Sequence, residues 1–181
     1  KRHNLQMADL MQNTGVLVAT DFKKKRLAAL SNHLERCHVA NTIVYHLDAR
    51  KASSLELKFN RILLDVPCSG NFVGEKDWFE RRTIADVKRN AELQRQILTE
   101  ATKVTKEDGE IIYATCSMEP EENESVITQF LKKHPNFAIS AHQTIAEKSV
   151  LPLMGADGFF RTAPHTHHMD GFFAARLTRM C

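Results

Sequence analysis

Two cysteines occupy equivalent places in the sequence, each at the end of a run of apolar residues. Cys68 follows the run in "RILLDVPCSG" (61–70), and Cys116 follows the run in "EIIYATCS" (110–117). A thiolate is a strong nucleophile where it is exposed and where neighbouring groups lower its pKa. One cysteine at a strand end is most often inert packing. Two at matching strand ends indicate a site that uses both thiols.

The residues around Cys68 suit chemistry at its sulfur. Pro67 fixes the backbone before the cysteine, and the small residues Ser69 and Gly70 let a substrate approach closely. The other two cysteines carry less information. Cys37 falls on the apolar stripe of a predicted helix, where we expect it to be packed, and Cys181 is terminal.

Three aspartates follow predicted strands in the same way as the cysteines. Asp21, Asp48 and Asp65 end the segments "VLVATD", "NTIVYHLD" and "RILLD". In open parallel sheets, ligands bind beyond the carboxyl ends of the strands, so these acids and both cysteines are predicted to face one crevice. Carboxylates there can accept hydrogen bonds from a ribose diol or an adenine amine. Alternatively, each acid caps the turn that follows it.

The elements that must position these side chains alternate along the chain. Short β-branched runs are separated by longer helical patterns, which predicts βα units and a mostly parallel sheet. Four helices are expected: one at 5–11, one with its apolar stripe at Leu27, Leu30, Leu34 and Cys37, one at 84–104 that "EDG" (107–109) stops, and one from Pro120. The last of these has Glu121, Glu122 and Glu124 in its first turn and buries Val126, Ile127, Phe130 and Leu131. Strands are expected at 16–20, 41–48, 61–65, 110–116 and 171–179.

Composition fits one globular domain with a sizeable core. The chain has 181 residues, is 43% hydrophobic and carries a formal net charge of +3. That charge permits an anionic partner without arguing for one. No apolar run reaches the ~18 residues that span a membrane, and the cysteines form no CxxC pair of the kind that binds structural zinc. We expect a soluble monomer with no metal and no disulfide.

The motifs together resemble the Nop/Sun family of RNA cytosine-5 methyltransferases, which use S-adenosylmethionine. The resemblance runs from about Leu10 to Arg179, and its most diagnostic part is "PCSG" combined with "TCS-x-x-x-EEN". Its other anchors are "NTGVLVATD", "NTIVYHLDAR", "LQRQIL" and "PHTHHMDGFFAARL". It implies a class I methyltransferase (Rossmann-like) α/β fold, a seven-stranded sheet with helices on both faces, and tRNA or rRNA as the partner.

The resemblance also implies a role for each cofactor residue. Asp21 would hold the ribose hydroxyls of S-adenosylmethionine, with Arg26 supporting that site, and Asp48 would hold the adenine end. Asp65 would lie between the methionine end and the target cytosine.

For the thiols, the resemblance makes Cys116 the nucleophile and Cys68 the cysteine that releases the product. Carbon 5 of cytosine is a poor nucleophile, and a thiolate that adds to carbon 6 makes the ring enamine-like. Asp65 would stabilise the charge that develops on the ring nitrogen side, and a base must then remove the carbon 5 proton. The target base must be unstacked to reach the crevice.

The sequence departs from the family in two places. The glycine-rich cofactor loop "PGGK" is absent, so we expect the central first strand to be missing and residues 1–181 to be an N-terminally incomplete catalytic domain. In "SGNFVGEKDW" (69–78), Phe72 and Trp78 replace small or proline positions. This is either loop drift or an altered substrate loop in which Lys76 touches phosphate. The histidines of "PHTHHMD" suggest a metal, but the resemblance makes them a loop, with His168 and Asp170 near the target base.

Two other readings stay open. A DNA cytosine-5 methyltransferase would use Cys68 itself as the nucleophile, but the Glu-Asn-Val strand end of that family is not found. A catalytically inactive RNA-binding scaffold of the same fold is the other. The expected location is cytoplasmic, or nuclear or nucleolar in a eukaryote.

Overall fold

The computed structural model describes residues 2–73, 77–140 and 148–180. The chain divides into two compact units, Lys1–Ser54 (unit 1) and Leu55–Cys181 (unit 2), each described here by itself. Across these ranges, no helix combines the length and the apolar character that crossing a bilayer requires.

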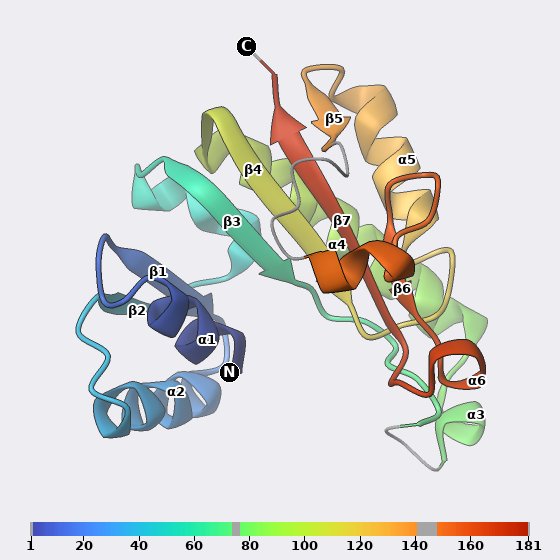
Figure 1. The fold of residues 1–181 in the computed structure, drawn as a ribbon, viewed down its shortest axis with the longest axis horizontal. Coiled ribbons are helices and arrows are strands. Elements are labelled where there is room, and N and C mark those ends of the chain that lie inside the picture. Colours follow the sequence, from blue (N-terminus) through green and yellow to red (C-terminus); the bar gives the residue numbers. More distant parts are fainter. Residues whose placement is uncertain (1, 74–76, 141–147, 181) are drawn as a thin grey trace. The chain divides into compact units, whose positions relative to one another are not determined.

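Unit 1 is a small parallel βα layer (Figure 1). It contains α1 (Arg2–Leu10), β1 (Leu17–Asp21), α2 (Lys24–Arg36) and β2 (Thr42–His46). The two strands pair in parallel from Leu17↔Thr42 to Asp21↔His46. Its core is formed by Ala19, Leu30 and Leu34, with Leu5, Val39 and Val44 packed around them. The predicted apolar stripe of α2 is confirmed at its three leucines, but it does not extend to Cys37, which caps the helix and is exposed.

Unit 2 is built on a five-stranded sheet. The strand order is β3 (Phe59–Asp65), β4 (Thr105–Thr115), β7 (Phe172–Arg179) and β5 (Phe137–Ile139), and β6 (Phe160–Thr162) pairs with β7 off this path. β3 and β4 are parallel, whereas the three pairs made by β7 are antiparallel. The seven described strands therefore form two sheets instead of the expected one. No described strand pairs with members of both sheets.

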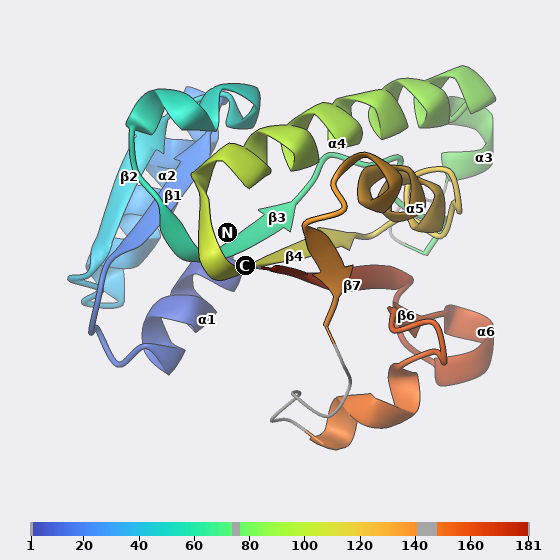
Figure 2. The ribbon, with the colours of Figure 1, turned by 90° about the horizontal axis from the view of Figure 1, so that it is seen from above.

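Helices cover both faces of this sheet. α4 (Ile84–Val104) and α5 (Glu124–Lys133) lie on one side, and α6 (Pro164–His167) lies on the other (Figure 2). Two shorter elements complete the unit, α3 (Trp78–Arg81) and the 3-10 helix η3 (Lys148–Leu153); another 3-10 segment, η1 (Ala49–Leu55), joins units 1 and 2. The core lies between the α4–α5 layer and the central strands, where Leu98, Ile111, Ile127 and Leu177 are fully buried.

Two expectations about helix ends in unit 2 are wrong, the stop signal of α4 and the start of α5. "EDG" does not stop α4: the helix ends at Val104, and Glu107–Gly109 lie within β4, which begins at Thr105. There the register with β3 shifts between Phe59 and Arg61, and a Cβ at Gly109 would lie 2.8 Å from the carbonyl oxygen of Lys106. The glycine is therefore needed for an irregularity inside a strand, not for a helix end.

The second wrong boundary is the start of α5. The helix begins at Glu124, not at Pro120, and Leu131 is only half-buried. Glu122 and Asn123 lie in the turn before it and are buried. The first-turn acids were expected at a helix start because negative charge suits that end. Glu122 instead points into the protein, where other groups hold it.

Candidate active site

The two cysteines meet at the carboxyl ends of β3 and β4. These strands are parallel neighbours with Asp65 opposite Ala114, so the loops that follow them begin side by side. Cys68 lies in the first loop and Cys116 directly follows β4, and their Sγ atoms are 3.1 Å apart. Cys116 is exposed and Cys68 is half-buried. The prediction that the two thiols lie at the tips of neighbouring strands is confirmed.

The two thiols hold unequal shares of negative charge. The hydrogen bond from Cys116 lowers the pKa of Cys68 to about 7, helped by backbone N–H groups, although burial and the charge of Glu122 oppose it. The same bond raises the pKa of Cys116 above its ordinary value, together with burial and the charges of Cys68 and Asp65. Of the two thiols, Cys68 therefore loses its proton first, and the Cys116 thiol can donate a hydrogen bond to the resulting thiolate.

A buried carboxyl group lies beneath the pair. Glu122 is fully buried, and its side chain accepts hydrogen bonds from Ser69 N at 3.0 and 3.1 Å and from Ser69 Oγ at 2.7 Å. Ser69 Oγ also lies 3.2 Å from Ser117 Oγ. Each cysteine is thus followed by a buried serine, and the two serines contact each other. Through them Glu122 joins the two cysteine loops.

Side-chain amides fix the backbone of the same loops. Asn71 Nδ2 donates to the carbonyl oxygen of Cys116 at 2.8 Å, and Asn123 Nδ2 donates to that of Ser117 at 2.9 Å. On the other loop, Gln94 Nε2 donates to the carbonyl oxygen of Pro67 at 2.9 Å. We name Ser69, Asn71, Gln94, Ser117, Glu122 and Asn123 the loop-locking network; all six are buried.

Sequence reasoning missed the role of this network, although one signal was available. Gln94 interrupts the apolar stripe of α4 between Ala91 and Leu98, three and four residues away, and all three are buried. A polar side chain on such a stripe implies a buried hydrogen-bond partner. "EEN" was noted as a family motif, but its glutamate was placed on a helix.

Asp65 is the one predicted acid in unit 2. It is the last residue of β3 and is exposed. Its charge contributes to the raised pKa of Cys116, so its carboxylate lies within electrostatic reach of the thiol pair. The structure therefore brings Asp65, Cys68 and Cys116 together, as predicted.

The other two acids lie together in unit 1, at the carboxyl ends of β1 and β2. Asp21 ends β1, and its Oδ1 accepts a hydrogen bond from Lys23 N at 2.8 Å, while its Oδ2 is 3.5 Å from Arg26 Nη1. Asp48 follows β2 by two residues. Its Oδ1 accepts from Arg50 N at 2.9 Å, and its Oδ2 accepts from Arg50 Nη2 at 2.6 Å.

Both acids therefore cap the turns that follow their strands, which was the alternative to ligand binding. The side chains nevertheless remain partly open, with 25% of Asp21 and 29% of Asp48 exposed. Arg26 does approach Asp21, as the resemblance implied. Arg50, which lowers the pKa of Asp48 through its hydrogen bonds, was not anticipated.

Comparison with known proteins decides the family. The family model described as "16S rRNA methyltransferase RsmB/F" matches residues 4–178. The chain belongs to the RsmB/F family. The human 28S rRNA (cytosine(4447)-C(5))-methyltransferase is 36% identical, with 96% of this chain and 23% of that protein covered. The tRNA (cytosine(72)-C(5))-methyltransferase of Pyrococcus horikoshii is 33% identical, with 96% and 43% covered.

Solved structures agree with this assignment. NSun6 from Pyrococcus horikoshii, crystallised with SFG, superposes with a TM-score of 0.83 at 29% identity, covering 97% of this chain and 44% of that one. A methyltransferase homologue from the same organism gives 0.79 at 31% identity, covering 96% and 56%. The fold is that of the class I, Rossmann-like methyltransferases. The chain spans 23% and 43% of the two curated relatives named above.

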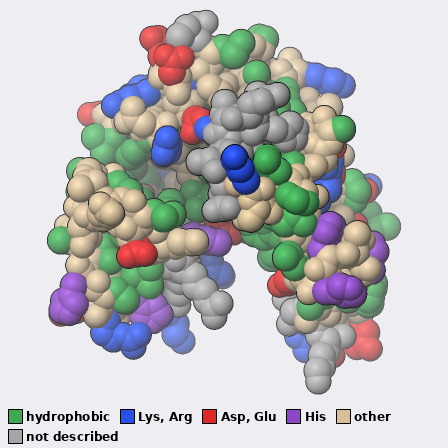
Figure 3. Space-filling model, viewed as in Figure 1, with side chains coloured by type: hydrophobic (Ala, Val, Ile, Leu, Met, Phe, Trp, Pro, Cys, Tyr) green, Lys and Arg blue, Asp and Glu red, His purple; other side chains and the backbone are tan. Residues whose placement is uncertain are grey.

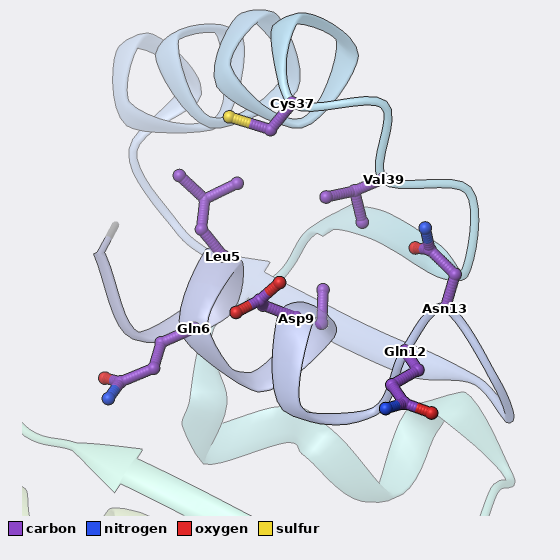
Figure 4. A pocket seen from close by; sticks show the side chains of 8 residues that line it. Leu5, Gln6, Asp9, Gln12, Asn13, Cys37 and Val39 are labelled. Carbon is purple, nitrogen blue, oxygen red and sulfur yellow. The ribbon is translucent and has the colours of Figure 1, made fainter.

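One pocket of this RsmB/F chain lies away from the predicted site residues. It has a volume of about 440 Å³ and is formed in unit 1 by α1, the end of α2 and the loop to β2. In Figure 4, Cys37 lies at the end of α2 and faces Leu5 of α1, with Asp9 and Val39 beside them. None of Asp21, Arg26 or Asp48 lines it.

The histidine segment forms α6 and its cap. Histidine side chains gather over α6 at the lower right of Figure 3. His167 Nδ1 accepts a hydrogen bond from Ala163 N at 3.0 Å, and His168 caps the helix in a left-handed conformation. Within the described ranges, no group of three or more histidine, cysteine or acidic side chains is arranged to hold a metal ion. Lys76, which would touch phosphate if the loop were an altered substrate loop, lies outside these ranges.

Proposed function

We propose that residues 1–181 are the catalytic domain of an S-adenosylmethionine-dependent RNA (cytosine-5)-methyltransferase acting on tRNA or rRNA. The observation that carries this proposal is the pair of thiols 3.1 Å apart at the ends of β3 and β4. Two thiols within reach of one base suit a reaction that must both form and break a bond to carbon 6. The relatives named as rRNA and tRNA cytosine-C5 methyltransferases support the substrate class.

Cofactor binding is assigned to unit 1. When bound, S-adenosylmethionine supplies the methyl group that carbon 5 receives. Asp21 and Asp48 fit such a molecule because their partly open carboxylates lie at the ends of two parallel strands. Asp21, steadied by Arg26, would accept hydrogen bonds from the ribose hydroxyls, and Asp48 would accept one from the adenine amine.

The first chemical step is assigned to Cys116. The Cys68 thiolate takes the proton of the hydrogen-bonded Cys116 thiol, and the Cys116 sulfur then forms a bond to carbon 6 of the cytosine. Electrons move toward the ring nitrogen, where a hydrogen bond donated by the Asp65 carboxyl group stabilises the negative charge, and carbon 5 becomes nucleophilic enough to accept the methyl group.

Product release is assigned to Cys68. This residue, now a thiol, first gives its proton to water. As a thiolate it removes the proton from methylated carbon 5. The electrons of that C–H bond re-form the carbon 5–carbon 6 double bond, and the bond from Cys116 to carbon 6 breaks.

One observation favours the opposite roles. The lowered pKa of Cys68 makes it the better thiolate, as the alternative with Cys68 as nucleophile requires. Exposure favours Cys116, because its sulfur is the more open to an incoming base. The two arrangements differ in which mutant accumulates a covalent intermediate.

The test incubates the Cys68→Ala and Cys116→Ala proteins with RNA and S-adenosylmethionine and follows protein–RNA adducts on denaturing gels. We expect Cys68→Ala to accumulate an adduct, because the release step fails, and Cys116→Ala to form none. Cys37→Ala, another free cysteine, is the control and should behave as the wild type.

The other outcomes have separate meanings. An adduct only in Cys116→Ala would reverse the roles. Methylation at the wild-type level by both variants would contradict the proposed role of the thiols. A wild-type protein that binds RNA but transfers no methyl group to any of it would favour the inactive scaffold.

The named relatives also bear on cellular location. The rRNA and tRNA named in the relatives fit a cytoplasmic protein, or a nuclear or nucleolar one in a eukaryote. The expectations of a monomer and of chemistry without a metal stay predictions.

A further inference from the structure

Two aromatic side chains in the segment that departs from the family pattern, Phe72 and Trp78, each contact a third, Phe79, which directly follows that segment. The rings of Phe72 and Phe79 are stacked, with centroids 5.7 Å apart and planes at 20°. Trp78 meets Phe79 edge to face, with centroids 5.1 Å apart. We name these three residues the aromatic cluster. Two of them, Phe72 and Trp78, are the residues found where the family has small or proline positions.

The aromatic cluster is not part of the core. Phe79 is 73% exposed and Phe72 is 41% exposed, and the adjacent Val73 is 51% exposed. Single exposed apolar residues are common, but contiguous exposed rings mark interaction sites. Loop drift alone would not keep three rings in contact while leaving two of them open to solvent.

A hydrogen bond ties the cluster to the thiol site. Trp78 Nε1 donates to the carbonyl oxygen of Ser69 at 2.9 Å. Ser69 is fully buried and held by Glu122, and it directly follows Cys68. The loop-locking network therefore positions the rings as well as the thiols. Trp78 and Phe79 lie on α3 (Figure 1), and Phe72 lies four residues after Cys68.

We propose that the aromatic cluster is a stacking platform for an unpaired nucleobase that flanks the target cytosine in single-stranded RNA. This inference rests on the proposed function. When the target cytosine flips out of its base stack, the neighbouring base loses its stacking partner on that side. Aromatic faces stack on any base, because every base has a π-face, and such contacts are typical of single-stranded RNA recognition. The continuity of the cluster with the Cys68 loop makes a nucleobase its fitting occupant.

The test is a thermodynamic cycle between a ring and a base. Binding of a short single-stranded RNA with one cytosine is measured by fluorescence anisotropy, for the wild type and for Phe79→Ala. Each protein is measured with the intact RNA and with RNAs made abasic at the nucleotide before or after the cytosine. With intact RNA, loss of the stack should raise the dissociation constant by about 5-fold to 100-fold. With the correct abasic RNA, Phe79→Ala should cost nothing further.

Side-chain chemistry and position supply the controls. Phe79→Tyr should keep wild-type affinity and Phe79→Leu should behave as Phe79→Ala, since leucine keeps apolar area but cannot stack. Ile84→Ala removes a side chain of similar exposure, 75%, from the start of α4, and should leave binding unchanged.

The outcomes separate this inference from the proposed function. Coupling between Phe79 and one abasic position supports the platform even if no methyl group is transferred, in which case only the proposed function fails. Equal losses with intact and abasic RNA, or no loss in Phe79→Ala, overturn the platform while methylation stands. If the aromatic cluster served a protein partner instead, Phe79→Ala would bind RNA as tightly as the wild type does. A wild type that binds no RNA would overturn both the platform and the proposed function.

Discussion

The acid site of unit 1 and the thiol site of unit 2 are built by different means. Asp21 and Asp48 are held by residues two to five positions along the chain, and the arginines involved, Arg26 and Arg50, have 56% and 49% of their side chains exposed. The thiols are held by groups that lie far apart in sequence. Glu122 and Ser69 are 53 residues apart, and Asn71 and Cys116 are 45 apart.

This difference fits the demands of the two sites. Hydrogen bonding to a ribose and an adenine requires two carboxylates near the ends of two strands, which local turns can supply. Thiol chemistry on one base requires two sulfurs within a fraction of an ångström of a working geometry, and only a rigid, buried support holds them so. The comparison predicts large, coupled effects of mutation in unit 2 and small, local ones in unit 1.

The largest effect is expected at Glu122. Glu122→Ala leaves the N–H and the hydroxyl of Ser69 buried without their acceptor, which should lower the free energy of unfolding by about 3 kcal/mol. Urea denaturation followed by circular dichroism measures it. The exposed neighbour Glu121 is the matched control, and Glu121→Ala should change stability by less than about 0.5 kcal/mol.

The variant Glu122→Gln then distinguishes the effect of the hydrogen bonds that Glu122 accepts from the effect of its negative charge. The amide keeps the shape but only one acceptor oxygen, so part of the stability should return. Because the charge of Glu122 raises the pKa of Cys68, its removal should lower that pKa further. If the Ala and Gln variants of Glu122 were as stable as the wild type, the network would not be what holds the two loops.

The second effect concerns the acidity of Cys68. Its pKa of about 7 depends first on the hydrogen bond from Cys116, so Cys116→Ala should move the pKa upward toward its ordinary value. At pH 7 the thiolate fraction, and with it the rate of alkylation by iodoacetamide, should fall about tenfold. Mass spectrometry of the Cys68 peptide across pH 5.5–9.5 gives the profile. If the midpoint of the alkylation rate against pH were the same in Cys116→Ala as in the wild type, Cys116 would not set the pKa of Cys68.

The sequence predicts most of what is local in these two sites. Short apolar runs that end in Asp21, Asp65 and Cys116 mark the strand ends, because the reactive residues lie at or directly after the last residue of each strand. Parallel pairing of the strands on either side of α4 then implies that the two thiols are neighbours.

The non-local part was not predictable in the same way. A glutamate beside a helix start is nearly always exposed, and only its pairing with Ser69, 53 residues earlier, makes the burial of Glu122 tolerable. The glycine of "EDG" was misread for a related reason. Gly109 serves a register shift against β3, and that pairing is invisible in the local pattern.

The smallest effect is expected at Arg50, in unit 1. Its hydrogen bonds lower the pKa of Asp48, so Arg50→Ala should raise that pKa toward its ordinary value. The pair favours the folded state where Asp48 is ionised, above about pH 4, and that contribution disappears as the pH falls through the lowered pKa. The urea midpoints of wild type and variant should therefore differ slightly at pH 7 and not at all at about pH 2. A separate NMR titration of the Asp48 carboxyl group measures the change in its pKa. Since about half of the Arg50 side chain is exposed, the pair should contribute little to stability. A midpoint change as large as that of Glu122→Ala would contradict the comparison, because the acid site would then be supported as rigidly as the thiols.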